Sequence, residues 1–179
     1  MKIFKKITFI LFMALAFASC SSDDDNNGGG DDDMNNSGEE FFRAKVEGAD
    51  WSADTDLASL IGGFMQTSNG MTTFQAQGST NEGSFINITI LGYNGPGTYV
   101  VADDNLQNAN SALYGASPAP ENIYVSNSII ALGGGIRPGE IVVTSQDDNG
   151  AQGTFSFEGF NDNGTRNVTD GEFKIVFDN

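Results

Sequence analysis

The chain has 179 residues, with 24 acidic and 8 basic side chains, a formal net charge of −16, no His and one Cys. The lack of His excludes Ser-His-Asp and Cys-His catalysis and imidazole zinc ligands, and one Cys excludes an internal disulfide and a thiolate metal cluster. The negative charge argues against DNA or RNA as a partner, because recognition of phosphates needs clustered Lys and Arg.

Residues 1–19 are predicted to be a secretory signal peptide. Lys2, Lys5 and Lys6 precede an apolar run from Ile7 to Ala18 that ends in small residues, which is the order of regions that such a peptide requires. The run is well short of the roughly 20 residues that a membrane-spanning helix needs. We therefore interpret the segment as removable rather than as a transmembrane anchor.

Cys20 follows this run and is predicted to be lipidated. The stretch Phe17 to Cys20 resembles a bacterial lipoprotein box, in which a small residue precedes a Cys that is acylated and becomes the new N-terminus; Phe17 stands where Leu is usual. Several acyl chains would hold the protein stably on a membrane, since each buried methylene contributes about 0.8 kcal/mol. The alternative is an unmodified Cys in an ordinary signal peptide.

Residues 20–40 are predicted to be a disordered acidic tether that begins at the lipidated Cys. Asp, Asn, Gly and Ser dominate the tract after Cys20, and such a composition cannot offset the conformational entropy lost on folding. Ser22 to Asp25 also resembles the acidic export signal by which Bacteroidota-type lipoproteins reach the outer face of the outer membrane. The alternative is a simple solvated spacer.

Residues 41–179 are predicted to form one all-β domain, either an antiparallel sandwich or a partly closed barrel. This part has 16 acidic and five basic residues, which give a net charge of −11. Its 139 residues are enough for one domain with its own hydrophobic core and too few to expect two. Apolar residues recur at every second position, which is typical of half-buried strands. These residues are Ile86, Ile88 and Ile90; Phe155 and Phe157; and Phe173, Ile175 and Phe177.

Four Asn-Gly pairs predict tight turns, because both central positions of a type I′ turn need positive φ. They are Asn69-Gly70, Asn94-Gly95, Asn149-Gly150 and Asn163-Gly164. We expect hairpins that join residues 58–67 to 71–78 and 139–146 to 153–160. The best candidate for a short helix is Asp104 to Tyr114, where Leu106, Ala109 and Leu113 fall at helical spacing.

Three stretches resemble a family of small Bacteroidota lipoproteins of uncharacterised function, which carry a β-rich domain after an acidic tether. They are Phe42 to Trp51; Gly97 to Tyr99; and the late run of Gly139 to Thr144, Gly153 to Phe157 and Val168 to Phe173. The likeness spans most of residues 41–177, except Asp103 to Ile136. It implies the fold and the location, and no catalytic residues.

Calcium is the metal that the acidic loops suit best, because hard cations prefer oxygen ligands. Asp162, Asp170 and Glu172 are the candidates. The spacing departs from an EF-hand loop: if Gly164 is the turn glycine, the first position falls on Gly159 and the twelfth on Asp170. No cofactor is therefore predicted, with calcium as the alternative.

Sugar binding could use the ring faces of Trp51 and the four tyrosines. Trp51 begins a predicted strand and is expected in the core, whereas Tyr93, Tyr114 and Tyr124 are expected to be more exposed. The Gly-rich stretch from Gly133 to Gly139 lacks the Gly-Lys-Ser/Thr ending of a phosphate loop, and we interpret it as a connection.

The leading hypothesis is a non-enzymatic cell-envelope lipoprotein. It would be anchored in the outer membrane through Cys20, face outwards, and bind an extracellular glycan or protein, or have a structural role. The alternative is an accessory component of a polysaccharide-processing system that binds carbohydrate or hydrolyses it weakly through a pair of carboxylates.

Overall fold

The computed structural model describes residues 39–56, 60–117, 119–133 and 135–177. The predicted signal peptide, Cys20 and the predicted tether up to residue 38 lie outside the described residues. The described part is nearly all β-structure. Its strands are β1 (Phe41–Val46), β2 (Ala49–Ser52), β3 (Ile61–Ser68), β4 (Met71–Ser79), β5 (Phe85–Leu91), β6 (Gly97–Val101), β7 (Ser111–Gly115), β8 (Ile123–Asn127), β9 (Gly139–Gln146), β10 (Gly150–Asn161) and β11 (Gly164–Val176), with short helices η1 (Pro120–Asn122) and α1 (Ser128–Leu132).

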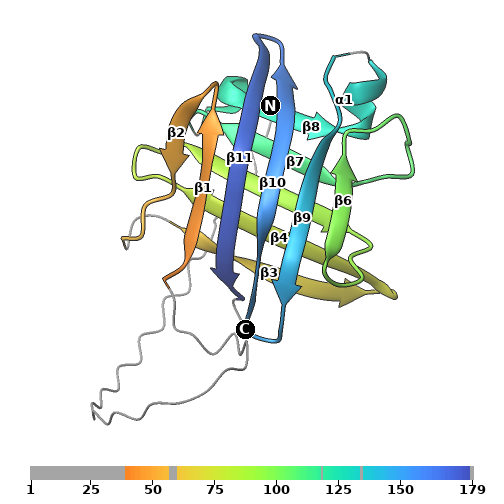
Figure 1. Ribbon diagram of the computed structural model, residues 1–179. Coiled ribbons are helices and arrows are strands. Elements are labelled where there is room, and N and C mark those ends of the chain that lie inside the picture. The colour runs from red at the N-terminus through yellow and green to blue at the C-terminus, as the bar shows by residue number, and fades with distance from the viewer. Residues whose placement is uncertain (1–38, 57–59, 118, 134, 178–179) are drawn as a thin grey trace, which may run out of the picture. The chain divides into compact units, whose positions relative to one another are not determined.

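The strands form one antiparallel sheet that curls over on itself into two layers (Figure 1). The front layer contains β2, β1, β11, β10, β9 and β6 in that spatial order, and the back layer contains β8, β7, β5, β4 and β3. In Figure 1 the strands of the back layer cross steeply behind those of the front layer. The predicted all-β class, a sandwich or partial barrel, is confirmed.

The long strand β10 joins the two layers. Its residues 151–156 pair with β9 in the front layer, whereas Phe160 pairs with Val125 of β8 in the back layer. The register with β9 shifts at Gln152, and such bulges bend a strand and increase its twist. At the other side of the curl, a single parallel bridge connects Gly63 of β3 to Phe177, directly after β11.

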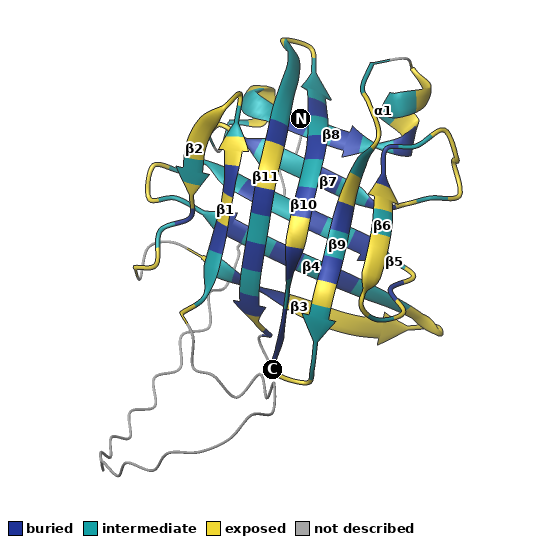
Figure 2. Cartoon of the chain, viewed as in Figure 1, coloured by how far each residue is buried: buried dark blue, intermediate teal, exposed yellow. Residues whose placement is uncertain are grey.

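Apolar side chains at alternate positions of both layers fill the space between them, and Figure 2 shows the resulting bands of buried residues along the strands. The Phe42 ring lies 5.0 Å from that of Phe155 and 6.1 Å from that of Phe173. The ring of Phe74, from the back layer, lies 6.1 Å from that of Phe173. Phenylalanines from both layers therefore meet in one cluster, and the predicted inward faces of β5, β10 and β11 are confirmed.

The Asn-Gly pairs have different roles in the structure. Asn69-Gly70 joins β3 to β4 with φ values of 52° and 78°, as a type I′ turn requires. The predicted hairpins β3–β4 and β9–β10 are both present. In the second hairpin, the Asp147 carboxylate holds the turn by accepting the backbone N–H groups of Asn149-Gly150. Asn94-Gly95 instead lies between strands of different layers.

The predicted helix at Asp104 to Tyr114 is wrong. Residues 111–115 form β7, which pairs with β5 and β8. The side chains of Asn105 and Asn108 each accept the backbone N–H group two residues later. Such local bonds offer the backbone an alternative to the helix. The described α-helix is α1 instead, where the Asn127 side chain caps the first turn.

We expect Phe42→Ala to reduce the free energy of unfolding by about 3–5 kcal/mol, because it opens a cavity between the layers. Phe42 is fully buried, whereas its neighbour Phe41 is only partly buried, with the Arg43 guanidinium over its ring. Phe41→Ala is therefore the matched control, with an expected loss below about 1 kcal/mol. Urea unfolding measures both, and equal losses would contradict a core between the layers.

Candidate functional site

The three calcium candidates do not form one group in the structure. Asp162 lies in the turn between β10 and β11, whereas Asp170 and Glu172 lie within β11. Each of these two pairs with a base of β1: the Asp170 carboxylate lies 3.0 Å from Lys45 Nζ, and the Glu172 carboxylate lies 2.5 Å from Arg43 Nη2. Among the described residues, no three or more acidic or Cys side chains are arranged to hold a metal ion.

A β-bulge explains where Asp170 lies. Thr169 and Asp170 of β11 together face the single residue Ser156 of β10. Asp170 has a φ of 50°, a left-handed conformation that Asp tolerates because its short side chain can form local hydrogen bonds. The bulge also places Val168 and Phe173 on the same buried face, although they lie five positions apart, an odd spacing that would put them on opposite faces of a regular strand.

The three tyrosines expected to be more exposed, Tyr93, Tyr114 and Tyr124, are buried or partly buried, so that expectation is wrong. Tyr93 and Tyr124 are only 6% and 4% exposed, and Tyr114 is partly buried and stacks on Tyr124. Burial raises the pKa of Tyr93 to about 12. These rings are buried because each one removes a large apolar surface from water when it packs into the fold.

Trp51 is partly buried and packs against the core, so its predicted place in the core is confirmed in part. Its ring meets that of Phe42 edge-on, with the centroids 6.3 Å apart. The indole Nε1 donates a hydrogen bond to Ser84 Oγ at 2.9 Å. The apolar part of the ring therefore packs against Phe42, and its polar N–H group is hydrogen-bonded to Ser84.

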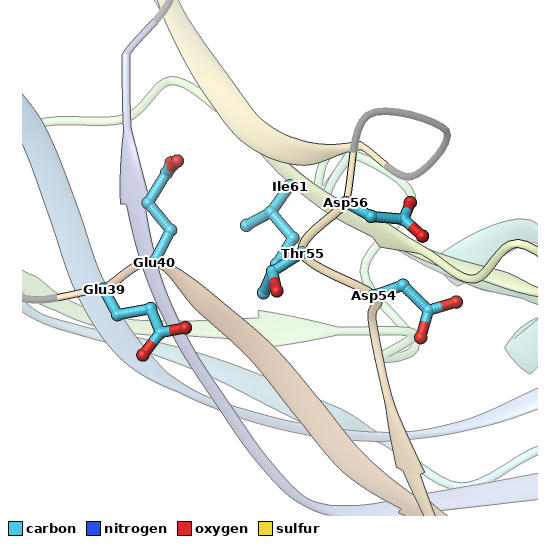
Figure 3. A pocket seen from close by; sticks show the side chains of 6 residues that line it. All are labelled: Glu39, Glu40, Asp54, Thr55, Asp56 and Ile61. Carbon is cyan, nitrogen blue, oxygen red and sulfur yellow. The ribbon is translucent and has the colours of Figure 1, made fainter.

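An acidic pocket of about 350 Å³ lies where β1 and β3 begin. It is lined by Glu39, Glu40, Asp54, Thr55, Asp56 and Ile61 (Figure 3). Figure 3 shows that the four carboxylates are spread around Thr55 and Ile61 and do not point to a common centre.

Several of these carboxylates bind nearby chain segments. Glu40 accepts the backbone N–H of Val176 at 2.7 Å, next to the end of β11. Asp54 accepts the backbone N–H of Asn81 at 2.7 Å, and Asp56 accepts the side-chain amide of Asn81 at 2.5 Å. These contacts favour a structural role, in which the acids fix the loop between β4 and β5 and the end of the last strand.

Arg137, in the Gly-rich connection before β9, pairs with an acid. Its Nε and its backbone N–H donate to Glu158 at 3.0 and 3.1 Å, and Nη2 donates to Asn167. The Glu158 side chain is 15% exposed. Burial alone would raise the pKa of its carboxyl, but the hydrogen bonds and charge of Arg137 outweigh burial and hold the pKa below its usual value.

Charge is distributed unequally between the two layers. The outward side of the front layer carries the bases and acids of β1 and β11 described above. The strands of the back layer, β3, β4, β5, β7 and β8, contain no charged residue. The chain has no Lys or Arg between Lys45 and Arg137. That gap is the sequence signal that could have identified an uncharged surface.

Amide and hydroxyl side chains lie on the outward side of the back layer, which they share with apolar side chains: Leu113 lies opposite Asn87, and Val125 lies opposite Leu113. We call the polar set the amide face. It consists of Gln75, Gln77, Asn87, Thr89, Ser111 and Asn127. Strand pairing brings them into rows: Gln75 lies opposite Thr89 and Gln77 lies opposite Asn87. Asn87 donates to Gln77 at 3.4 Å and accepts from Thr89 at 3.2 Å, so these three side chains form a connected polar cluster.

Comparisons of the chain with known protein families, curated proteins and solved structures found no match. Among the described residues, no helix is both long enough and apolar enough to span a membrane.

We expect Arg137→Gln to reduce the free energy of unfolding by about 1 kcal/mol at neutral pH. The pKa of the Glu158 carboxyl is lower in the folded state than in the unfolded state, where it is about 4.3. The stabilisation of the fold by ionised Glu158 is therefore complete above the unfolded pKa and is lost as the pH falls through the folded pKa. The effect of the substitution should therefore disappear in acid.

Denaturant unfolding across a pH series measures this effect. Arg43→Gln is the control, because the Arg43–Glu172 pair is about half exposed and should contribute less. An Arg137→Gln effect that persists at low pH would contradict the charge-based explanation.

Proposed function

We propose that this protein is a non-enzymatic lipoprotein of the cell envelope, anchored through Cys20, whose β-domain binds an uncharged extracellular glycan through the amide face. The basic and apolar regions before Cys20 and the acidic tract after it support the location. The amide face carries the proposal for binding, because its amide and hydroxyl side chains lie on strands without charge in a protein of net charge −16.

The chemistry of the amide face fits sugar hydroxyl groups. Side-chain amides and hydroxyls can each donate and accept hydrogen bonds, as sugar hydroxyls do. An ionised ligand would lose hydration on such a surface without gaining an opposite charge. A neutral glycan avoids that cost and is not repelled by the acidic domain. The same face supports an accessory carbohydrate-binding role in a polysaccharide-processing system.

We expect the full-length chain to be retained on gels that contain a neutral polysaccharide, and the triple variant Gln75→Ala, Gln77→Ala, Asn87→Ala to lose at least about tenfold in affinity. The matched control is Gln152→Ala with Thr154→Ala on β10, which removes an amide and a hydroxyl from the front layer. Retention should vary little with salt, since no ion pairs are involved. Equal loss in both variants, or strong salt dependence, would contradict the amide face as the site.

We expect Cys20→Ala to move the protein from the membrane fraction to the soluble fraction while the β-domain still folds. The reason is that acyl chains on Cys20 would supply the membrane affinity. Fractionation followed by immunoblotting measures the distribution, and circular dichroism of the released protein tests the fold. A variant that stays in the membrane fraction would refute anchoring through Cys20.

A further inference from the structure

Three strands of the described sheet pair with only one other strand: β2, β6 and β3. An edge strand presents a row of backbone N–H and C=O groups that can pair with another chain. Proteins usually limit such pairing with short edge strands, charged side chains or covering loops. The three edges of this domain differ in whether they have such protection.

The edges at β2 and β6 are protected. β2 has four residues and includes the charged side chain of Asp50. β6 has five residues, and its Val100 carbonyl accepts hydrogen bonds from the side-chain amides of Asn108 and Asn110, each at 2.9 Å. The loop before β7 therefore occupies part of the β6 edge.

The β3 edge has none of these features. β3 has eight residues, and these include no charged residue and no Pro. The parallel bridge at Gly63 occupies only its beginning, and the following residues, Phe64 to Ser68, are all exposed. Large exposed apolar side chains also gather here: Leu60, Phe64, Met65 and Met71, with exposed fractions between 36% and 52%.

We propose that β3 pairs antiparallel with β3 of a second copy of this chain, around a two-fold axis near Gln66. Charge selects this edge for self-pairing, since two domains that each carry a net charge of −11 repel each other least where the facing surfaces are uncharged. The β3–β4 hairpin, with its Asn-Gly turn, contains no charged residue. A two-fold axis places this uncharged strand against itself.

The pairing would also cover exposed apolar surface. With the axis at Gln66, Met65 lies opposite Thr67 of the second copy, and Phe64 lies opposite Ser68 of the second copy. Met adapts its shape to irregular contacts, and Phe64 would lie across a strand pair, where cross-strand contacts stabilise sheets. The two back layers would join into one continuous sheet. This inference does not depend on glycan binding.

Sedimentation of the full-length chain in density-matched detergent tests the proposal. We expect a dimer for the unsubstituted chain, and at least about a tenfold weaker dimer for Gln66→Lys and for Gln66→Glu, because each places like charges opposite each other. An equimolar mixture of the two variants should regain the dimer. Thr98→Lys, on the exposed side of β6, is the matched control and should leave the dimer unchanged.

Disulfide trapping provides a second measurement that does not depend on introduced charge. A single Cys is placed in turn at Phe64, Met65, Gln66, Thr67 and Ser68 of the full-length Cys20→Ala chain. Residues directly opposite in antiparallel strands have Cα atoms about 4.5–5.5 Å apart, within disulfide range. We expect a cross-linked dimer at the position on the axis and none for Thr98→Cys. A monomeric unsubstituted chain, an intact Gln66→Lys dimer, or no cross-link along β3 would overturn the proposal.

Discussion

The fold depends on the packing of phenylalanine rings between its two layers. Phe42, Phe155 and Phe173 come from the front layer and Phe74 comes from the back layer, and their rings meet at distances of 5.0 to 6.1 Å. Burial of such rings is the main term that can offset the loss of chain entropy. Glycine makes the close approach possible: a Cβ at Gly78 would lie 2.7 Å from the Phe42 Cβ.

Once these rings face inward, strand alternation places every second side chain outward, and the two outward faces differ. On the front layer, acids and bases of β1 and β11 pair across the strands at half-exposed positions, where ion pairs contribute little to stability. On the back layer, amide, hydroxyl and apolar side chains take the same positions, and none of them is charged. The amide face and the uncharged β3 edge belong to this one layer, so both proposed interactions lie away from the charged face.

Several acidic side chains in the described part of the chain accept hydrogen bonds from backbone N–H groups and do not form a metal site. Asp147 holds the β9–β10 turn, Asp54 accepts a backbone N–H from the loop after β4, and Glu40 accepts one next to the end of β11. Asp170 occupies the positive-φ position of a bulge. The change of alternation between Val168 and Phe173 is the sequence signal that could have predicted this bulge, because one extra residue reverses the alternation of faces. Acids in turns and bulges therefore resemble metal ligands in the sequence without being grouped in space.

The sequence by itself determined the β class, the inward faces of β5, β10 and β11, and the turn at Asn69-Gly70, since alternation and turn preferences act over a few neighbouring residues. Only the tertiary structure decided that β10 passes between layers, that Tyr93 and Tyr124 are buried, and that residues 111–115 form a strand. It also brought the uncharged strands β4, β5, β7 and β8 together into the amide face. These outcomes depend on pairings between residues far apart in the chain, which local patterns do not encode.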